Sequence, residues 1–431
     1  MCKTKNGVNR VASASSLNAT PNKAAWRSSF VPGKSALPSI AEIKASIPAE
    51  CFERSALHSF YFVIRDTLLA ALCVLAAYYF LPTSLPSSGL LSLAGLKWFL
   101  GWNLYAFWMG AVCTGHWVLA HECGHNAFST SRLLNDAVGF VLHQLLLVPY
   151  FAWQYSHKKH HRRTNHLVDG ETHIPSTGAE NGISADPSEP HTLVAAIHEV
   201  LGDGLFGVFQ VFTHLAIGWP LYLLGFAQTG RLAYGGAPLT GFADHFRPGS
   251  EMFPETLRPA IALSTLGVVA GLALLGKLSL TYGPLPVFLY YFGPYLWVNC
   301  WLVLYTWLQH TDPTVPHYGE SDWTWVAGAL STIDRPYYIF DYLHHDIGSS
   351  HVVHHLFHEM PFYRARVATV AAKKFLGPLY NYDPTPFPIA MWKIAMTCHY
   401  VESLEGTQYY KSFNDLPKSS VKSGKTKSKK A

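Results

Sequence analysis

Long apolar runs in this sequence fall into two pairs, and a short turn joins the members of each pair. The first pair is 66–82 and 97–120, and the second is 258–276 and 283–308. With its flanking residues, each run approaches the roughly 20 residues that a helix needs to cross a hydrocarbon core of about 30 Å. The pattern therefore predicts four transmembrane helices arranged as two hairpins.

Two further apolar segments, 133–151 and 201–226, contain internal polar residues. Internal His, Gln and Asp side chains fit a membrane-surface or re-entrant helix better than a free-standing span. Histidine motifs lie before and after these segments, and an even number of spans must separate motifs that meet at one site. The hairpin 258–308 supplies two spans, so 201–226 is predicted to lie in the interface.

Positive charge indicates which side of the membrane the histidine motifs occupy. Cytosolic loops carry an excess of Lys and Arg, so we expect the histidine side to be cytosolic. The residues concerned are Lys158, Lys159, Arg162, Arg163, Arg364, Arg366, Lys373 and Lys374. The basic run 158–163 can also receive an acidic protein or anionic headgroups.

Composition favours one membrane-embedded unit. Of 431 residues, 49% are hydrophobic and only 14% are charged, against about a quarter in soluble domains. The seven dispersed cysteines form no C-x-x-C pair and do not make a disulfide framework. We expect a flexible basic tail at 1–40, a membrane domain at 41–411 and a basic tail at 412–431. Beside membrane spans, this basic charge indicates an anionic lipid surface and not nucleic acid.

Histidines form three clusters that can bind metal. On a helix, positions i, i+3 and i+4 share one face, so each cluster can direct two or three imidazoles to one side. Neutral imidazole binds Fe, Zn, Cu or Ni. Eight imidazoles exceed the ligand set of one zinc ion, which takes three or four protein ligands, so they indicate two metals. The clusters are His121 and His125; His157, His160 and His161; and His351, His354 and His355.

The first cluster alone supports a different function. "HECGH" at 121–125 matches the H-E-x-x-H motif of zinc metalloproteases, in which the glutamate is the general base. A membrane zinc protease explains this motif with Glu122 as base, but it leaves the other two clusters without a role. A lipid-binding membrane protein without catalysis explains none of the three.

The clusters resemble the three histidine boxes of the membrane fatty acid desaturase family, as "HECGH", "SHKKHH" and "HVVHHLFHEMPFY". Segments 306–335 and 47–60 are similar to the microsomal Δ12/ω-3 acyl-lipid branch, and the resemblance covers about residues 40–410. It implies an all-α integral membrane fold with four transmembrane helices, interfacial helices and a cytosolic histidine-rich cap that holds two iron ions.

The resemblance also implies roles for residues outside the three clusters. His310 is the expected ninth ligand, and His317 is the weaker candidate for that position. Glu122 is expected to orient a ligand histidine instead of acting as a base. His345 is expected to contact a ligand histidine in the same way.

The implied reaction is the O₂-dependent insertion of a cis double bond into an acyl chain. Glu122 within HECGH favours Δ12 desaturation, from oleoyl to linoleoyl, over the ω-3 (Δ15) reaction. A hydroxylase, epoxygenase or conjugase on the same scaffold stays open. Front-end desaturation is disfavoured, because the third box begins with His351 where that branch usually has Gln.

The resemblance implies an acyl-phospholipid substrate, and electrons from a separate cytochrome b5 and its reductase, because the chain has no H-P-G-G haem motif. It leaves open a homo-oligomer or a hetero-oligomer with other desaturases. Lys427 and Lys429 form a K-x-K-x-x pattern typical of retrieval to the endoplasmic reticulum. The N-terminus, which lacks acidic residues, leaves a plastid membrane as the alternative.

Overall fold

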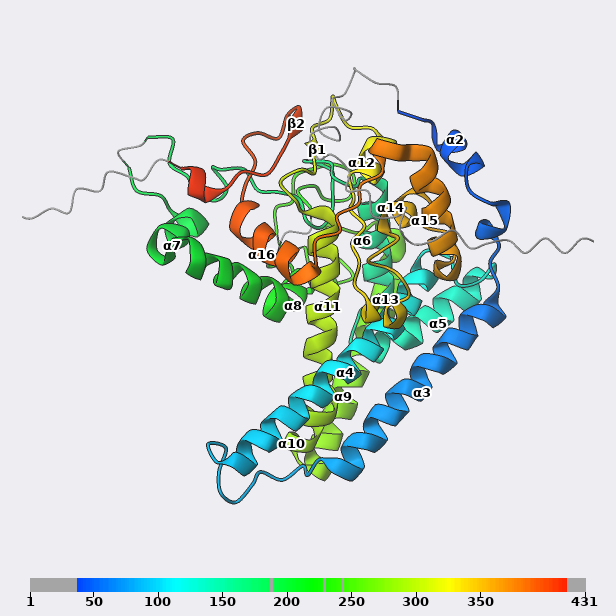
Figure 1. Cartoon of the computed structure of the whole chain (residues 1–431), viewed down its shortest axis with the longest axis vertical. Coiled ribbons are helices and arrows are strands. Elements are labelled where there is room, and N and C mark those ends of the chain that lie inside the picture. The colour runs from blue at the N-terminus through cyan, green and yellow to red at the C-terminus, as the bar shows by residue number, and fades with distance from the viewer. Residues whose placement is uncertain (1–36, 187–188, 228–229, 242, 417–431) are drawn as a thin grey trace, which may run out of the picture.

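The computed structural model describes residues 37–186, 189–227, 230–241 and 243–416. Nearly all of the two predicted tails, with Lys427 and Lys429, lies outside these residues. The described chain is mainly helical, as predicted, and its strands β1 (His317–Tyr318) and β2 (Thr407–Gln408) pair antiparallel over two residues. Figure 1 shows one group of helices extending to one end and the remaining elements gathered at the other.

The first hairpin consists of α3 (Ala56–Phe80) and α4 (Leu93–Gly124). Ser55 and Ser92 cap the two helices, because each side chain accepts a hydrogen bond from a backbone N–H three residues later. A helix of 32 residues is about 48 Å long at 1.5 Å per residue, more than the hydrocarbon core of about 30 Å. The C-terminal turns of α4 therefore carry His121 beyond the apolar layer.

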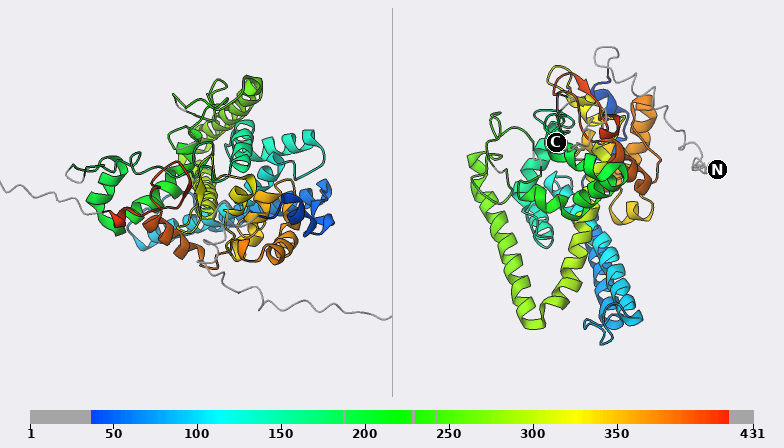
Figure 2. Two further views of the ribbon diagram at one scale, coloured as in Figure 1. Left: turned by 90° about the horizontal axis from the view of Figure 1, so that it is seen from above. Right: turned by 90° about the vertical axis from the view of Figure 1, so that its left-hand side faces the viewer.

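The second hairpin consists of α9 (Arg258–Tyr282), α10 (Pro284–Val287), the π-helix η5 (Phe288–Phe292) and α11 (Gly293–His310). Helix α11 packs along α4. Their backbones approach closely at Gly110, where an added Cβ would lie 2.4 Å from Trp297 Cβ. In Figure 2 both hairpins extend in the same direction from the rest of the molecule. This arrangement matches the two predicted hairpins.

Hydropathy and length select a slightly different set of spans. Among the described residues they select Ala56–Phe80, Leu193–Leu223, Glu255–Tyr282 and Pro284–His310. Helix α4 is not selected, because its Trp, Tyr, Asn, Gly and His residues lower its hydropathy. The segment predicted to be interfacial is selected, yet Figure 1 shows its main helix, α7 (Leu193–Phe212), running across the hairpins. The interfacial placement of this segment stays a prediction.

The segment predicted as one interfacial helix at 133–151 is two helices. Helix α5 (Arg132–Gln144) ends before Pro149, and α6 (Tyr150–Arg162) begins after it. Leu147, between them, has a positive φ of 55°, which a leucine rarely adopts. The break turns α6 away from α5, so that the second histidine cluster lies on a helix of its own. Segment 201–226 also continues past α7, through the π-helix η3 (Thr213–Ile217) and α8 (Gly218–Leu223).

The C-terminal third builds a cap over the histidine side. It packs α12 (Trp325–Leu330), α14 (His351–Leu356) and α15 (Phe362–Leu376) together, and the side chains of Val352 and Val353 are fully buried. Asp334 accepts the backbone N–H of Val352 and so holds the start of α14. The remaining short elements are α2 (Ile40–Ala45), η2 (Ala49–Phe52), η4 (Glu255–Leu257), α13 (Ile339–Leu343), η6 (Gly377–Leu379), α16 (Phe387–Thr397) and η7 (Phe413–Asp415).

Packing continues beyond residue 411, where the C-terminal tail is predicted to begin. Phe413 is buried, and its ring stacks on His399 at 4.7 Å. It also meets Phe206 of α7, with ring centroids 5.7 Å apart. The contact between Phe413 and α7 thus belongs to the folded domain.

Candidate metal centre

Four segments bring the predicted ligand histidines to one place. His121 lies in the last turn of α4 and His125 caps that helix, while His310 is the last residue of α11. The other two clusters lie on α6 and α14. The hairpins therefore deliver three imidazoles, α6 adds three, and α14 of the cap adds three more.

The first group contains five histidines. Their candidate ligand atoms all lie within 4.8 Å of one another. Within it, His125 Nε2 lies 3.2 Å from His121 Nε2, and His161 Nε2 lies 3.2 Å from His157 Nε2. The members are His121, His125, His157, His161 and His354.

The second group joins α6, α11 and α14. It contains His160, His310 and His355. His310 Nε2 lies 3.1 Å from His160 Nε2 and 3.0 Å from His351 Nε2. His351 therefore adjoins this group, and the structure brings all nine predicted ligands together.

These nitrogen distances fit metal coordination. Two nitrogens at about 2.1 Å from one ion and at right angles to each other lie about 3 Å apart. In the part of the chain that the structure describes, the buried Nε2 atoms of His354 and His355 have no hydrogen-bond partner. A buried nitrogen without a partner is costly, and a metal ion in each group would satisfy both.

The imidazoles are also in the protonation state that metals require. Burial, followed by the neighbouring imidazole of His121, lowers the pKa of His160 to about 3. Burial likewise lowers the pKa of His157 and His161 well below the usual range of histidine. These rings are neutral at pH 7, with a lone pair free for a metal.

Hydroxyl groups hold two of the ligand histidines from behind. Thr164 Oγ1 lies 3.0 Å from His355 Nδ1, and Thr172 Oγ1 lies 3.1 Å from His160 Nδ1. Such contacts fix the ring orientation and leave Nε2 for the metal. Sequence reasoning missed both threonines. The spacing of four residues between His160 and Thr164, which follows the end of α6, was an available signal, whereas Thr172 lies in a loop.

Glu122 lies beside the ligand His121, in a position to orient its ring. Its Oε1 is 3.3 Å from His121 Nδ1, and its Oε2 accepts the backbone N–H of Phe362 at 3.1 Å. The carboxylate is therefore on the Nδ1 side of His121, while the Nε2 atoms of His121 and His125 meet on the other side.

The predicted places of His345 and His317 beside the ligand histidines are wrong. His345 Nε2 lies 2.8 Å from Asp66 Oδ2 of α3, and its Nδ1 lies 3.5 Å from the Arg65 guanidinium. His345 has a positive φ of 58°, in a turn after α13 that directs the ring to α3. His317 lies in β1 with its ring 5.2 Å from that of Tyr410, and it belongs to neither group.

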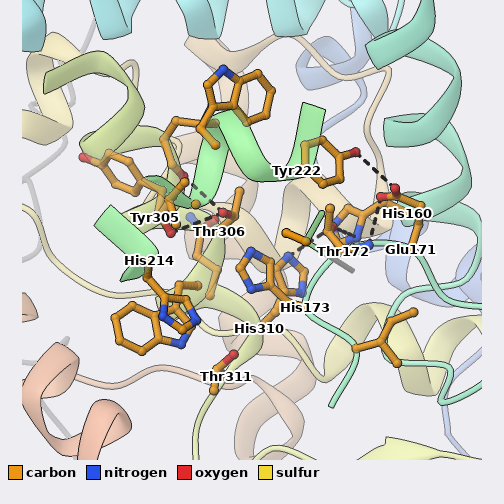
Figure 3. Close-up of a pocket in the computed structure, with 18 of the residues that line it drawn as sticks. His160, Glu171, Thr172, His173, His214, Tyr222, Tyr305, Thr306, His310 and Thr311 are labelled. Carbon is orange, nitrogen blue, oxygen red and sulfur yellow. Dashed lines mark hydrogen bonds between the residues drawn. The ribbon is translucent and has the colours of Figure 1, made fainter. Parts of the chain in front are cut away.

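A cavity of about 300 Å³ opens beside the histidines. His121 and His157 of the first group and His160 and His310 of the second line it, so both groups face the same space. Figure 3 shows His160, His173 and His310 at this cavity, with His214 farther along it. Much of the remaining wall is apolar, formed by Trp117, Val118, Trp153, Trp219, Leu302, Val303 and Ile347.

Comparisons with known proteins agree with this site. A family model described as "Fatty acid desaturase" matches residues 96–385, which include all nine histidines. The chain belongs to the fatty acid desaturase family. It is a membrane desaturase by family, and the histidine-lined cavity at the end of its hairpins is the candidate active site.

Curated relatives match this desaturase over most of its length. A "Delta(12) fatty acid desaturase" of Mortierella alpina is 40% identical, over 86% of the chain and 90% of that relative. An "Omega-6 fatty acid desaturase, endoplasmic reticulum isozyme 2" of Glycine max is also 40% identical, over 86% of the chain and 89% of the relative. An "Oleoyl-12-hydroxylase" of Ricinus communis is 38% identical, over 85% of the chain and 87% of the relative.

Proposed function

We propose that this desaturase introduces a cis double bond at Δ12 of an oleoyl chain, with a di-iron centre held by nine histidines. The observation that carries the proposal is the pair of adjoining histidine groups beside one apolar cavity. Bound iron would supply the oxidising power that removal of hydrogen from an unactivated CH₂ requires. The protein orients the ligands and keeps the reacting part of the acyl chain away from water.

The ligand assignment divides the nine histidines between two ions. His121, His125, His157, His161 and His354 hold the first, and His160, His310, His351 and His355 hold the second. Support comes from the contacts between Nε2 atoms within each group and from the unpartnered Nε2 atoms of His354 and His355, as far as the described residues go. O₂ is the co-substrate, since no other oxidant is needed to form an alkene and two waters.

The Δ12 position rests on the relatives and on one residue of the first motif. Relatives with Δ12 or omega-6 in their names match most of the chain, and Glu122 of HECGH favours the same reaction over ω-3 desaturation. Hydroxylation at the same carbon is the second candidate, because the Ricinus communis relative is nearly as similar. Both reactions remove a hydrogen from C12, so the product separates them.

A zinc protease fits the geometry poorly. The base of such an enzyme must reach a water on the metal, which binds on the side where the ligand nitrogens meet. Glu122 lies on the opposite, Nδ1 side of His121 and is held by the backbone of Phe362. The protease function also leaves His160, His310 and His355, a second metal-capable group, without a role.

We expect the electrons to come from a separate cytochrome b5 and its reductase, and the acyl chain from a phospholipid in the same membrane. Lys158 and Arg162 are exposed on α6, next to the ligands of both groups, and suit an acidic donor. Lys159 and Arg163 are less available, because both pair with Asp169. The name of the Glycine max relative supports the endoplasmic reticulum as the location. Association with itself or with other desaturases is a further expectation.

Expression in a host that makes oleate but no linoleate tests the proposal. We expect 18:2 Δ9,12 in the lipids and about two iron ions per purified chain. His354→Ala, which remains in the membrane, should form no product. A 12-hydroxy product would favour the second candidate, and a new ω-3 bond only after linoleate feeding would overturn the Δ12 assignment. One zinc ion per chain in place of iron would overturn the di-iron centre.

A further inference from the structure

The cavity contains a buried carboxyl group that the ligand assignment does not use. Glu171 is 2% exposed and lines the same space as His160 and His310. Burial raises the pKa of its carboxyl to about 8, although the charge of Lys159 acts in the opposite direction. Burial therefore favours the neutral carboxylic acid, which can give up a proton.

A series of buried polar groups starts at this carboxyl. The Tyr222 hydroxyl lies 3.1 Å from Glu171 Oε1 and 3.1 Å from Ser156 Oγ, and Ser156 Oγ lies 3.0 Å from His245 Nε2. Figure 3 shows the Tyr222 hydroxyl directed at Glu171, with Thr172 and His160 beside it. We call Tyr222, Ser156 and His245 the buried chain, because each is less than a tenth exposed.

The buried chain has the properties of a proton path. A hydroxyl can donate one hydrogen bond while it accepts another, so a proton can pass from Ser156 through Tyr222 to Glu171. Burial lowers the pKa of His245 to about 4, so its ring is neutral and has one nitrogen that donates and one that accepts. His245 Nδ1, at the far end of the chain, is buried and has no hydrogen-bond partner among the described residues. The chain therefore passes protons between internal groups and ends at His245.

The inner end of the path lies close to a ligand histidine. The other carboxyl oxygen, Glu171 Oε2, accepts the backbone N–H of Thr172 at 2.9 Å. The hydroxyl of Thr172 holds His160 at Nδ1. Glu171 is therefore fixed at the cavity wall beside the second group without being one of the ligands.

The reaction proposed above needs protons in this cavity. One O₂, two donor electrons and two protons enter, two hydrogen atoms leave the acyl chain, and one double bond and two waters form. The acyl chain supplies two of the four hydrogens of the waters, so two protons must come from outside. The cavity wall is largely apolar, so a defined donor has to deliver them.

We infer that Glu171 is the group that delivers these protons to the cavity. The buried chain can return a proton to Glu171 from Ser156 through Tyr222. This role rests on the proposed oxygen-dependent function. In this role Glu171 transfers protons and does not bind metal.

The test compares Glu171→Gln with Glu171→Asp and with Glu189→Gln in the full-length protein. Glutamine keeps the shape and hydrogen bonds of Glu171 but has no acidic proton. Aspartate keeps the acid, and Glu189 is an exposed glutamate that precedes α7. The infrared spectrum, the iron content and the turnover are measured for each variant.

We expect the wild type minus Glu171→Gln infrared difference spectrum to show the carbonyl band of a protonated carboxylic acid. Iron content should equal that of the wild type. Turnover should fall about 100-fold or more with an unchanged KM for the acyl substrate. Glu171→Asp should recover part of the turnover, and Glu189→Gln should match the wild type. Tyr222→Phe, which interrupts the buried chain, should also slow turnover with full iron content.

Three results would overturn the inference. The first is an infrared difference spectrum without a carboxylic acid band, and the second is Glu171→Gln turnover equal to the wild type. The third is loss of iron from Glu171→Gln, which would make Glu171 a residue that positions His160 through Thr172. Failure of the proposed function would be seen separately, because the wild type itself would then form no desaturated product. The infrared comparison would still report whether Glu171 is protonated.

Discussion

His160 and His310 are 150 positions apart in the sequence, yet their Nε2 atoms lie 3.1 Å apart in the structure. His160 comes from α6, and His310 is the last residue of the second hairpin. The contact joins α6 to the membrane hairpin at the second histidine group. It also separates the two candidates for the ninth ligand, because His317 lies against Tyr410 and outside both groups.

His310→Ala is therefore expected to remove one metal and not both. The first group keeps its five histidines, so iron content should fall from about two ions per chain to about one, and product formation should stop. Iron analysis of the purified variant checks this. His317→Gln is the matched control, and we expect it to keep both ions. Loss of iron from His317→Gln with full iron in His310→Ala would reverse the assignment.

Glu122→Gln separates the desaturase from the protease that HECGH alone suggested. A glutamine oxygen can still accept the Phe362 N–H, and no step of the desaturase needs a base at this position. We expect iron content near two and turnover lowered by about 10- to 100-fold, the typical cost of changing a group behind a ligand. Fatty-acid analysis of the expressing cells measures the outcome. Complete loss of turnover with both irons bound would restore Glu122 as a catalytic base.

The threonines behind the ligands give a prediction that the histidine pattern does not contain. Thr164→Val and Thr172→Val keep the side-chain shape and remove the hydroxyls that contact His355 Nδ1 and His160 Nδ1. The rings should turn more freely, and iron affinity should fall by 10- to 100-fold. Chelator competition on each purified variant checks this. Thr67→Val, on the exposed surface of α3, is the control, and an effect there as large as at Thr164 would contradict the specific role of the hydroxyls.

The ligand histidines could be predicted from the sequence because their spacing is local. Within each cluster, positions three and four apart share a helix face, and a second metal follows from the number of imidazoles. The groups around the ligands could not be predicted in this way. Glu171 and Tyr222 meet only because α8 folds back over the loop after α6, and nothing near Glu171 in the sequence marks it as buried. His345 was misassigned for the same reason, because its closeness to the third box did not reveal the turn that directs it to Asp66.

The hairpins were predicted more completely than the helices between them. Apolar length identified α3, α4, α9 and α11, and the short turns fixed their pairing. The break at Pro149 divides 133–151 into two helices, and α4 reaches past the membrane with a polar end. Hydropathy cannot distinguish a span from a long apolar helix that lies across the hairpins, which is why Leu193–Leu223 resembles a span by composition.

The contact between His345 and Asp66 predicts a variant that changes stability without changing the metal centre. Both side chains are less than 5% exposed, and Arg65 also pairs with Asp66. His345→Ala would leave a buried carboxylate with one partner fewer, and breaking a buried pair costs about 3–5 kcal/mol. We expect a lower unfolding temperature in detergent, with iron content and turnover per folded chain close to the wild type. His58→Ala is the control, because its exposed ring only stacks on Tyr363 and Phe62. Iron loss from folded His345→Ala chains would instead support the predicted role of His345 beside a ligand.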